Sequence, residues 1–228
     1  PQIEYTARVH GAGSRAVVAM SLGGLALGHE SATTAVQTAL QLHEQLDLSR
    51  TSPPAFLADV VEQANDAVLD MARKAGVEGD AGATLLLVLL QDNSIHWASA
   101  GDSRIYLCRG TELAQLTTDQ NHYTELLAKV SSGAMTIDQA RAHPDRAALV
   151  NYIGNPELRP ADVSLRPLPL QQGDWLLLCS DGLYGTLSND EILAELYGSP
   201  QAASDRLVKK VLAQNRSNQD NVTVSILG

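Results

Sequence analysis

Apolar residues repeat at helical intervals in the first third of the chain. The stretch 32–46 carries its apolar residues on one helical face, and a second such stretch follows Ser52-Pro53-Pro54. The apolar positions of the second stretch are Phe56, Val60, Ala64, Val68 and Met71. This spacing predicts two helices, and Pro54 suits the first turn of the second. Two short apolar runs, at residues 3–9 and 16–20, precede the helices and predict strands.

From residue 83 onward the apolar pattern is typical of strands. Residues 84–90 are almost continuously apolar, which indicates a strand buried on both faces. An antiparallel meander is expected from four strands, at residues 84–90, 95–100, 104–109 and 112–116. Further along, the pattern predicts a strand pair at 162–168 and 174–180, joined by Gln172-Gly173, and a last strand at 222–227. Helices are predicted at 123–130, 136–142, 189–196 and 201–214. Antiparallel strands with paired helices predict an α+β sandwich in which helices cover two sheets.

Composition narrows the possible function classes. The 228 residues include 44% hydrophobic and 18% charged side chains, a balance typical of a single globular domain spanning 1–228. The net charge of −10, without a cluster of Lys and Arg, excludes a nucleic-acid partner. The longest apolar run, residues 83–90, is too short to span a membrane, and the first residues lack a signal-peptide pattern. We therefore expect a cytoplasmic protein with no membrane contact, processed or excised at its N-terminus because Met is missing there. Cys108 and Cys179 lie in apolar stretches and are expected to be buried free thiols.

Three acidic residues stand out because each lies at the end of a strand-like run beside small residues. They are Asp102 in Gly101-Asp102-Ser103-Arg104, Asp181 in Ser180-Asp181-Gly182, and Asp220 in Asp220-Asn221. Carboxylates at strand ends point into clefts, and several that converge form the oxygen-ligand sites that Mg²⁺ and Mn²⁺ prefer. Each single instance is also ordinary turn chemistry. Spacing alone therefore leaves a metal site and a set of turns as alternatives.

Six short sequence stretches, which include these three acids, together resemble a known family. They are GATL at 82–85, AGDSRIY at 100–106, LTTD at 116–119, HP at 143–144, GDWLLLCSDGL at 173–183 and DNVT at 220–223. Together they span nearly the whole chain, which resembles the metal-dependent type-2C protein serine/threonine phosphatases (the PPM family). The resemblance implies a four-layer α-β-β-α sandwich with a flap at about 122–154. It also implies a two-metal site in which a metal-activated water attacks phosphoserine or phosphothreonine. In that site Asp181 and Asp220 would be metal ligands, and Asp102 would serve a third, weaker metal.

The departure from the family lies at the N-terminus and affects the chemistry. The family ends a strand there with Asp-Gly-x-Gly-Gly, whose Asp bridges both metals and whose first Gly carbonyl is a ligand. This chain reads Met20-Ser21-Leu22-Gly23-Gly24, the upstream segment 10–15 contains no acid, and the first Asp is Asp47, predicted inside a helix. A thioether is soft and uncharged, whereas Mg²⁺ and Mn²⁺ require oxygen ligands. We therefore expect at most one weakly bound Mg²⁺ or Mn²⁺, or none, and little or no turnover.

Few basic residues can take the place of the family's phosphate-binding Arg, which precedes the missing acidic pair. Arg8 and Arg15 are the candidates, and both are equally consistent with solvated surface cations. Arg104 is expected to be a strand residue near Asp102, with which it could pair. The six histidines show no metal-ligand spacing.

The leading interpretation is a type-2C phosphatase-like domain that is a catalytically impaired pseudophosphatase. It would have a regulatory or phosphoprotein-binding role in Ser/Thr phosphorylation signalling, with a phosphoprotein or a protein kinase as partner. One alternative is an active metal-dependent phosphatase whose site is reorganised, with Glu30 leaning towards Asp181. Another is a pure protein-interaction module in which the remaining acids have no function.

Overall fold

The computed structural model describes residues 5–12, 15–23, 27–215 and 220–228, with only the backbone for 5–12, 15–19 and 21–23. Within these residues the first sheet consists of β1 (Tyr5–Ala12), β2 (Arg15–Gly23), β3 (Ala83–Gln91), β4 (Ser94–Ala100), β7 (Asp162–Val163) and β8 (Leu168–Pro169). The second sheet consists of β5 (Arg104–Arg109), β6 (Glu112–Gln115), β9 (Trp175–Cys179) and β10 (Val224–Leu227). The helices are α1 (Gly28–Glu44), α2 (Pro53–Ala75), α3 (His122–Ser131), α4 (Ile137–Arg141), α5 (Asp181–Tyr184), α6 (Asn189–Leu193) and α7 (Pro200–Ala213).

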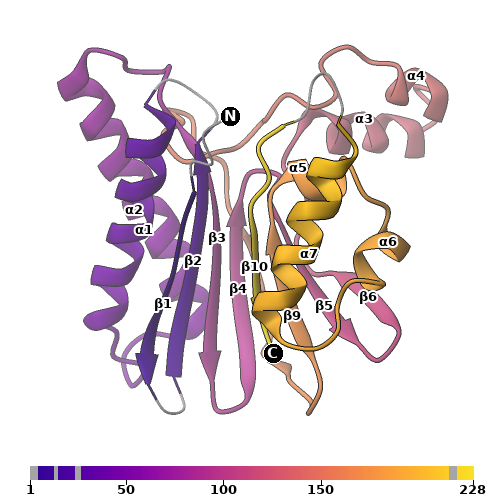
Figure 1. Ribbon diagram of the computed structural model, residues 1–228. Helices are drawn as coiled ribbons and strands as arrows, with labels where there is room; N and C mark the ends of the chain where they lie inside the picture. Colours follow the sequence, from indigo (N-terminus) through magenta and orange to yellow (C-terminus); the bar gives the residue numbers. More distant parts are fainter. Residues whose placement is uncertain (1–4, 13–14, 24–26, 216–219) are drawn as a thin grey trace.

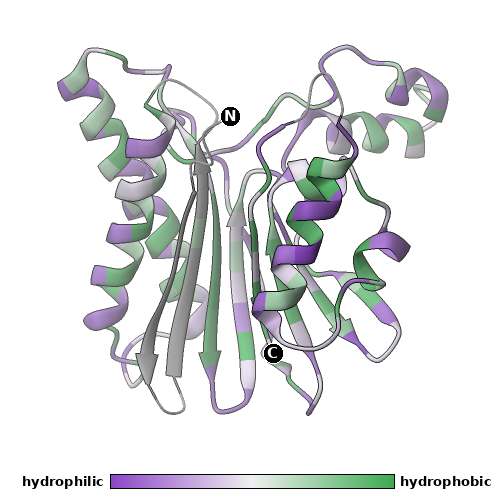
Figure 2. Cartoon of the chain, in the orientation of Figure 1, coloured by the Kyte–Doolittle hydropathy of each residue, from purple (hydrophilic) through white to green (hydrophobic). Residues whose placement is uncertain are grey.

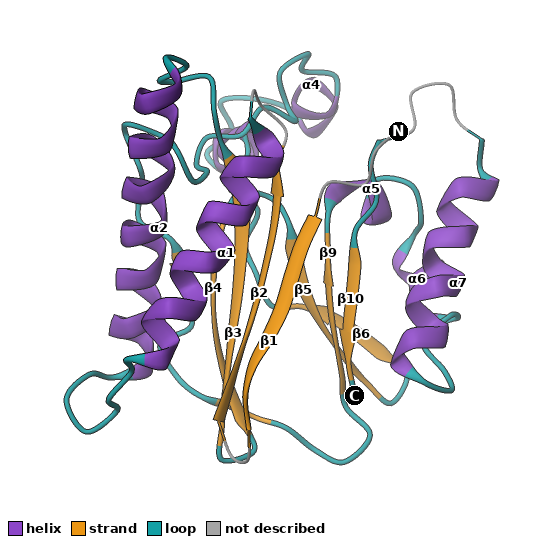
Figure 3. Ribbon diagram, turned by 60° about the vertical axis from the view of Figure 1, so that its left-hand side comes forward, coloured by secondary structure: helices purple, strands orange, loops and turns teal. Residues whose placement is uncertain are grey.

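The two antiparallel sheets pack face to face between layers of helix. The first sheet has the strand order β1-β2-β3-β4-β7, with β8 also paired to β4, and the second has the order β10-β9-β5-β6. Helices α1 and α2 cover the outer face of the first sheet, and α7 covers the outer face of the second (Figures 1 and 3). Helices α3 and α4 lie beyond one end of the sheets, at the upper right of Figure 1. This is the α+β four-layer sandwich that the sequence pattern and the resemblance predicted.

Strand alternation explains the nearly continuous apolar run of β3, which is mostly green, the hydrophobic colour, in Figure 2. Leu85, Leu87 and Leu89 point outward into a core shared with α1 and α2. Leu86 and Val88 point inward, into the core between the two sheets. Because successive side chains of a strand lie on opposite faces, a strand covered on both sides needs apolar residues at every position. A third core, between the second sheet and α5 to α7, completes the layers.

Two strand predictions are wrong in their pairing. The expected four-stranded meander is divided between the sheets, because β3 pairs with β4 and β5 pairs with β6, but β4 and β5 do not pair. The expected strand at 162–168 is two short strands, β7 and β8, and both pair with β4 rather than with β9. Leu165 lies between them and is 82% exposed, so this segment leaves the sheet in the middle. The hairpin prediction failed because β9 instead lies between β5 and β10 in the other sheet.

The helix predictions hold, with shifted ends. Helix α1 begins at Gly28, before the predicted residue 32, and ends at Glu44. Asp47 therefore lies after the helix rather than inside it, as we had expected, and its carboxylate accepts hydrogen bonds from the Ser49 backbone and side chain. The four-residue helix α5 was not predicted. None of the helices that the structure describes is both long and apolar enough to cross a membrane. Cys108 and Cys179 are buried free thiols, as predicted.

Candidate functional site

Asp102 lies where the chain crosses from the first sheet to the second. Gly101 directly follows β4 with a φ of +113°, and a side chain there would lie 2.6 Å from the Thr84 methyl group. The next turn is held by a hydrogen bond of 2.8 Å between the hydroxyls of Thr84 and Ser103. The Tyr184 hydroxyl donates to the Asp102 carbonyl oxygen at 2.8 Å, which ties the crossover to α5. The carboxylate of Asp102 is thereby held at one end of the paired sheets.

Asp181 begins α5 directly after β9, and a close backbone approach places it near Asp220. The Ser180 hydroxyl accepts a hydrogen bond from the Thr223 amide at 3.0 Å, and the Ser180 amide donates to the Thr223 carbonyl at 3.2 Å. A side chain at Gly182 would collide with the Asn221 carbonyl oxygen. The Asp181-Gly182 pair therefore serves packing, because only glycine lets the start of α5 lie against the segment that carries Asp220.

These three aspartates line one cleft of about 520 Å³ at the end of the sandwich. Its walls are formed by the β4–β5 crossover and the start of β5, by α5 and the residues after it, by the segment between β6 and β7, and by Asp220 before β10. The lining residues are Asp102, Arg104, Asp119, Asn121, Tyr123, Arg141, Arg146, Ala147, Asp181, Gly182, Tyr184, Gly185, Thr186 and Asp220. The sequence prediction that the three acids converge is thus matched by the geometry, while their role as metal ligands stays a prediction.

Burial and crowding of like charges disfavour ionisation in this cleft. Burial, followed by the neighbouring charges of Asp181 and Asp119, raises the pKa of Asp102 to about 7. Burial and the charge of Asp220 also raise the pKa of Asp181. Arg104 opposes both shifts but does not cancel them. Ionisation of Asp102 and Asp181 is therefore less favourable than that of a solvated carboxyl group.

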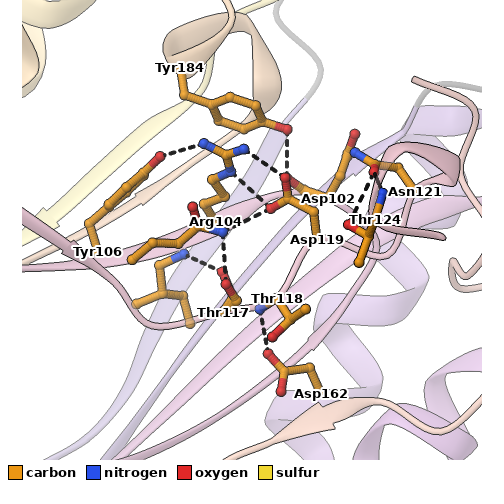
Figure 4. A network of polar contacts seen from close by, with 12 residues as sticks. Asp102, Arg104, Tyr106, Thr117, Thr118, Asp119, Asn121, Thr124, Asp162 and Tyr184 are labelled. Carbon is orange, nitrogen blue, oxygen red and sulfur yellow. Dashed lines mark hydrogen bonds and ion pairs between the residues drawn. The ribbon is translucent and has the colours of Figure 1, made fainter. Parts of the chain in front are cut away.

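Arg104 is held by a polar network on the floor of the cleft (Figure 4). Its Nε and Nη2 atoms donate to the two carboxylate oxygens of Asp119 at 2.9 and 2.6 Å, and its Nη1 donates to the Tyr106 hydroxyl at 2.8 Å. The guanidinium carbon lies 3.5 Å from the centre of the Tyr184 ring, a cation–π contact. We had expected Arg104 to pair with Asp102. Its partner is Asp119 because the chain after β6 returns beside β5 and brings that carboxylate within bidentate range.

Two further arginines line the cleft from the segment between α3 and β7. Arg141 is in the last turn of α4, and Arg146 follows the His143-Pro144 pair. Both are exposed, and neither forms an ion pair with a described residue. The motifs did not single out either arginine, because nothing in their local sequence sets them apart from solvated surface cations. Asp119 and Tyr184 were also missed as cleft residues, although Asp119 ends the LTTD stretch.

Met20, which the sequence resemblance aligns with a bridging aspartate, is completely buried and is not among the residues that line the cleft. Its side chain packs in the core between the sheets with Leu86, Ile105 and Leu178. Among the described residues, no group of three or more His, Cys, Asp and Glu side chains is arranged to hold a metal ion. Mg²⁺ and Mn²⁺ need several oxygen ligands, and the expected impairment of a two-metal site stays a prediction.

The remaining predicted residues do not enter the described cleft. Glu30 is exposed in the first turn of α1 and is not among the lining residues. Only the backbone of Arg8, Arg15 and Ser21 is described, in β1 and β2, so the predicted phosphate contacts and the degenerate ligand position at Ser21 lie outside the described side chains.

Comparison with known proteins finds a matching family model, sequence relatives and similar solved structures. A family model described as protein phosphatase 2C matches residues 4–222. Protein phosphatase PhpP of Streptococcus pneumoniae is 33% identical over 174 residues, 75% of this chain and 68% of that protein. The serine/threonine protein phosphatase PstP of Mycobacterium tuberculosis is 34% identical over 204 residues, 87% of this chain but 38% of that protein.

Among solved structures, the Streptococcus agalactiae serine/threonine phosphatase matches with a TM-score of 0.83 and 24% identity over 99% of this chain and 92% of that one. The M. tuberculosis PstP/Ppp structure matches with a TM-score of 0.76 and 27% identity over 97% and 96% of the two chains.

Proposed function

This chain belongs to the protein phosphatase 2C family, and on that premise we propose that it is a pseudophosphatase: a member that keeps the fold and binds phosphoproteins but turns them over little or not at all. Its role would be regulatory, in Ser/Thr phosphorylation signalling, with a phosphoprotein or a protein kinase as partner. Its relatives carry the names of serine/threonine phosphatases, and the family generally uses Mg²⁺ or Mn²⁺.

The observation that carries the proposal is the burial of Met20. The side chain is 0% exposed and surrounded by leucines, isoleucine and valine of both sheets. A thioether in a dry core neither coordinates a hard cation nor offsets the repulsion between two cations. Asp102, Asp181 and Asp220 remain at the cleft, but without the bridging carboxylate they do not form a two-metal site.

The binding half of the proposal is supported by the cleft itself. A concave site of about 520 Å³ is large enough for a phosphorylated side chain. Arg141 and Arg146 offer guanidinium groups at this site, and guanidinium binds phosphate through paired N–H donors. The cleft therefore has the recognition chemistry of a phosphoprotein-binding site even where the metal chemistry is missing.

A paired assay tests this function. The purified chain is incubated with a phosphoserine or phosphothreonine peptide and Mn²⁺, beside the Asp181→Ala variant and beside PstP of M. tuberculosis as an active control. We expect no turnover above that of Asp181→Ala, with the bound peptide recovered still phosphorylated. Turnover comparable to PstP that Asp181→Ala abolishes would show an active enzyme and overturn the proposal. A chain that neither hydrolyses nor binds the peptide would support a different kind of interaction module.

A further inference from the structure

The charges of the cleft are arranged in two zones. Four aspartates lie on its floor and walls, with Arg104 among them, while Arg141 and Arg146 come from the separate segment that carries α3 and α4. In Figure 1 this segment stands away from the sandwich, beyond the ends of the strands. Asp102, Asp181 and Asp220 therefore reach the cleft from the ends of the sandwich, and Arg141 and Arg146 reach it from a different segment of the chain.

Two carboxylates of the acidic zone, those of Asp102 and Asp181, have no ion-pair partner among the described residues, whereas Asp119 pairs with Arg104. Asp102 is 9% exposed, and neither Asp102 nor Asp181 forms an ion pair with a described residue. Arg104 is the cation nearest to them in the network, but its three guanidinium nitrogens are already bonded to Asp119 and to the Tyr106 hydroxyl. The ionised form of a carboxylate that is nine-tenths buried and unpaired is unfavourable, and a cation supplied by a ligand would stabilise it.

An organic cation fits this zone better than a metal ion does. The described residues offer no metal-binding group of three ligands. A Lys ammonium or an Arg guanidinium needs only hydrogen-bond acceptors, and charge-assisted bonds to one or two carboxylates satisfy it. The side chain of a partner protein is the ordinary source of such a group.

The basic zone requires the opposite charge. Arg141 and Arg146 are exposed and have no acidic partner among the described residues. A phosphate dianion is attracted to them and repelled by Asp102 and Asp181. The two zones together select a ligand that carries both charges.

We propose that the cleft binds a phosphorylated segment with a basic residue close to the phosphorylated one, so that the phosphate contacts Arg141 and Arg146 and the basic side chain contacts Asp102 and Asp181. This inference rests on the proposed phosphoprotein-binding function and specifies the class of segment that is bound. Binding would then be independent of divalent metal ions, because the partner's own side chain supplies the cation.

Matched peptides test the proposal by fluorescence anisotropy in the presence of EDTA. The parent set consists of short labelled peptides with a central phosphoserine and one Arg, placed at each position from four residues before it to four after it. The best binder is then compared with its serine form, its Arg→Gln form and the form with both changes. We expect each single change to weaken binding about tenfold. Addition of millimolar Mg²⁺ should leave the affinity unchanged.

Protein variants assign each half of the ligand to its zone. Arg141→Gln combined with Arg146→Gln should remove the advantage of the phosphorylated peptides and leave the advantage of the Arg. Asp102→Asn, and separately Asp181→Asn, should remove the advantage of the peptides that carry Arg and leave the advantage of the phosphorylated peptides. Thermal unfolding of each variant checks that it is folded. If one of the two Asp variants does not fold, the other still tests the acidic zone.

Three results would overturn the inference. If the phosphate of the peptide strengthens binding but its Arg does not, the acidic zone does not bind a basic side chain. The proposed phosphoprotein binding then still stands. If the Arg alone matters, both the inference and phosphoprotein binding fail. Binding that needs a divalent ion would show that a metal, rather than a basic side chain, occupies the acidic zone.

Discussion

Met20 on β2 lies directly opposite Leu86 on β3, and both side chains are fully buried in the core between the two sheets. Under the proposed function this is the position of the family's bridging aspartate, and a buried thioether takes the place of a carboxylate. The proposal therefore predicts that the same side chain stabilises the core and leaves the cleft without a bridging ligand.

The first prediction concerns Met20 itself. Met20→Asp places a carboxylate in a dry core without a partner and should lower the free energy of unfolding by about 3 kcal/mol or more. The control Met20→Leu keeps the volume and should cost less than about 1.5 kcal/mol. Urea unfolding measures both. Equal stability of the Asp variant and the wild type would show that the position has access to water or to cations.

The Arg104–Asp119 pair should contribute strongly to the stability of the cleft. The two side chains are 21% and 14% exposed, and the bidentate geometry leaves an unpaired charge when either partner is removed. Arg104→Met or Asp119→Leu alone should cost about 3 kcal/mol. The double variant should cost less than the sum of the two, and a double-mutant cycle by urea unfolding measures the coupling. Additive losses would indicate that the pair does not act as a unit.

The contribution of Asp102 to stability should fall as pH rises from about 4 to about 7. Asp102 has its pKa raised from 3.8 to about 7 by burial and by Asp181 and Asp119, against the opposing charge of Arg104. In this range the folded state therefore binds more protons than the unfolded state, so its stability is greatest below the unfolded pKa and is lost as pH passes through the folded one. Across this range, wild-type stability should fall relative to Asp102→Asn by roughly 1–3 kcal/mol. Parallel pH profiles for the two proteins would contradict this assignment.

The segment that carries the two cleft arginines is anchored to α2 at its C-terminal end. The Asn65 side chain accepts from the Gly154 amide at 2.7 Å and donates to the Asn155 carbonyl at 3.2 Å. Asn65 is buried, so Asn65→Ala leaves two backbone groups unsatisfied and should cost about 1–3 kcal/mol. The neighbouring exposed Asp66→Ala is the control and should change stability by less than about 0.5 kcal/mol. An unchanged melting temperature for Asn65→Ala would show that this anchor is not needed.

The layered fold and the acidic positions were predictable from the sequence because they depend on local pattern. The apolar run of β3 indicates a strand that is buried on both faces. Asp102 and Asp181 belong to sequence motifs that lie at the ends of strands. Strand partners were not predictable in the same way: nothing local in Gly101-Asp102-Ser103 distinguishes a hairpin turn from a crossover between sheets. The pairing of Arg104 with Asp119 and the positions of Arg141 and Arg146 depend on how distant segments return to the cleft.

The central claim, that this cleft does not form a two-metal centre, is tested most directly by calorimetric titration of Mn²⁺ into the wild-type protein. PstP of M. tuberculosis serves as the positive control, and phosphatase activity is assayed on the same samples. We predict at most one weak binding event and no turnover above background. Tight binding of two ions per chain, accompanied by turnover, would show that other groups replace the missing carboxylates and would contradict the account.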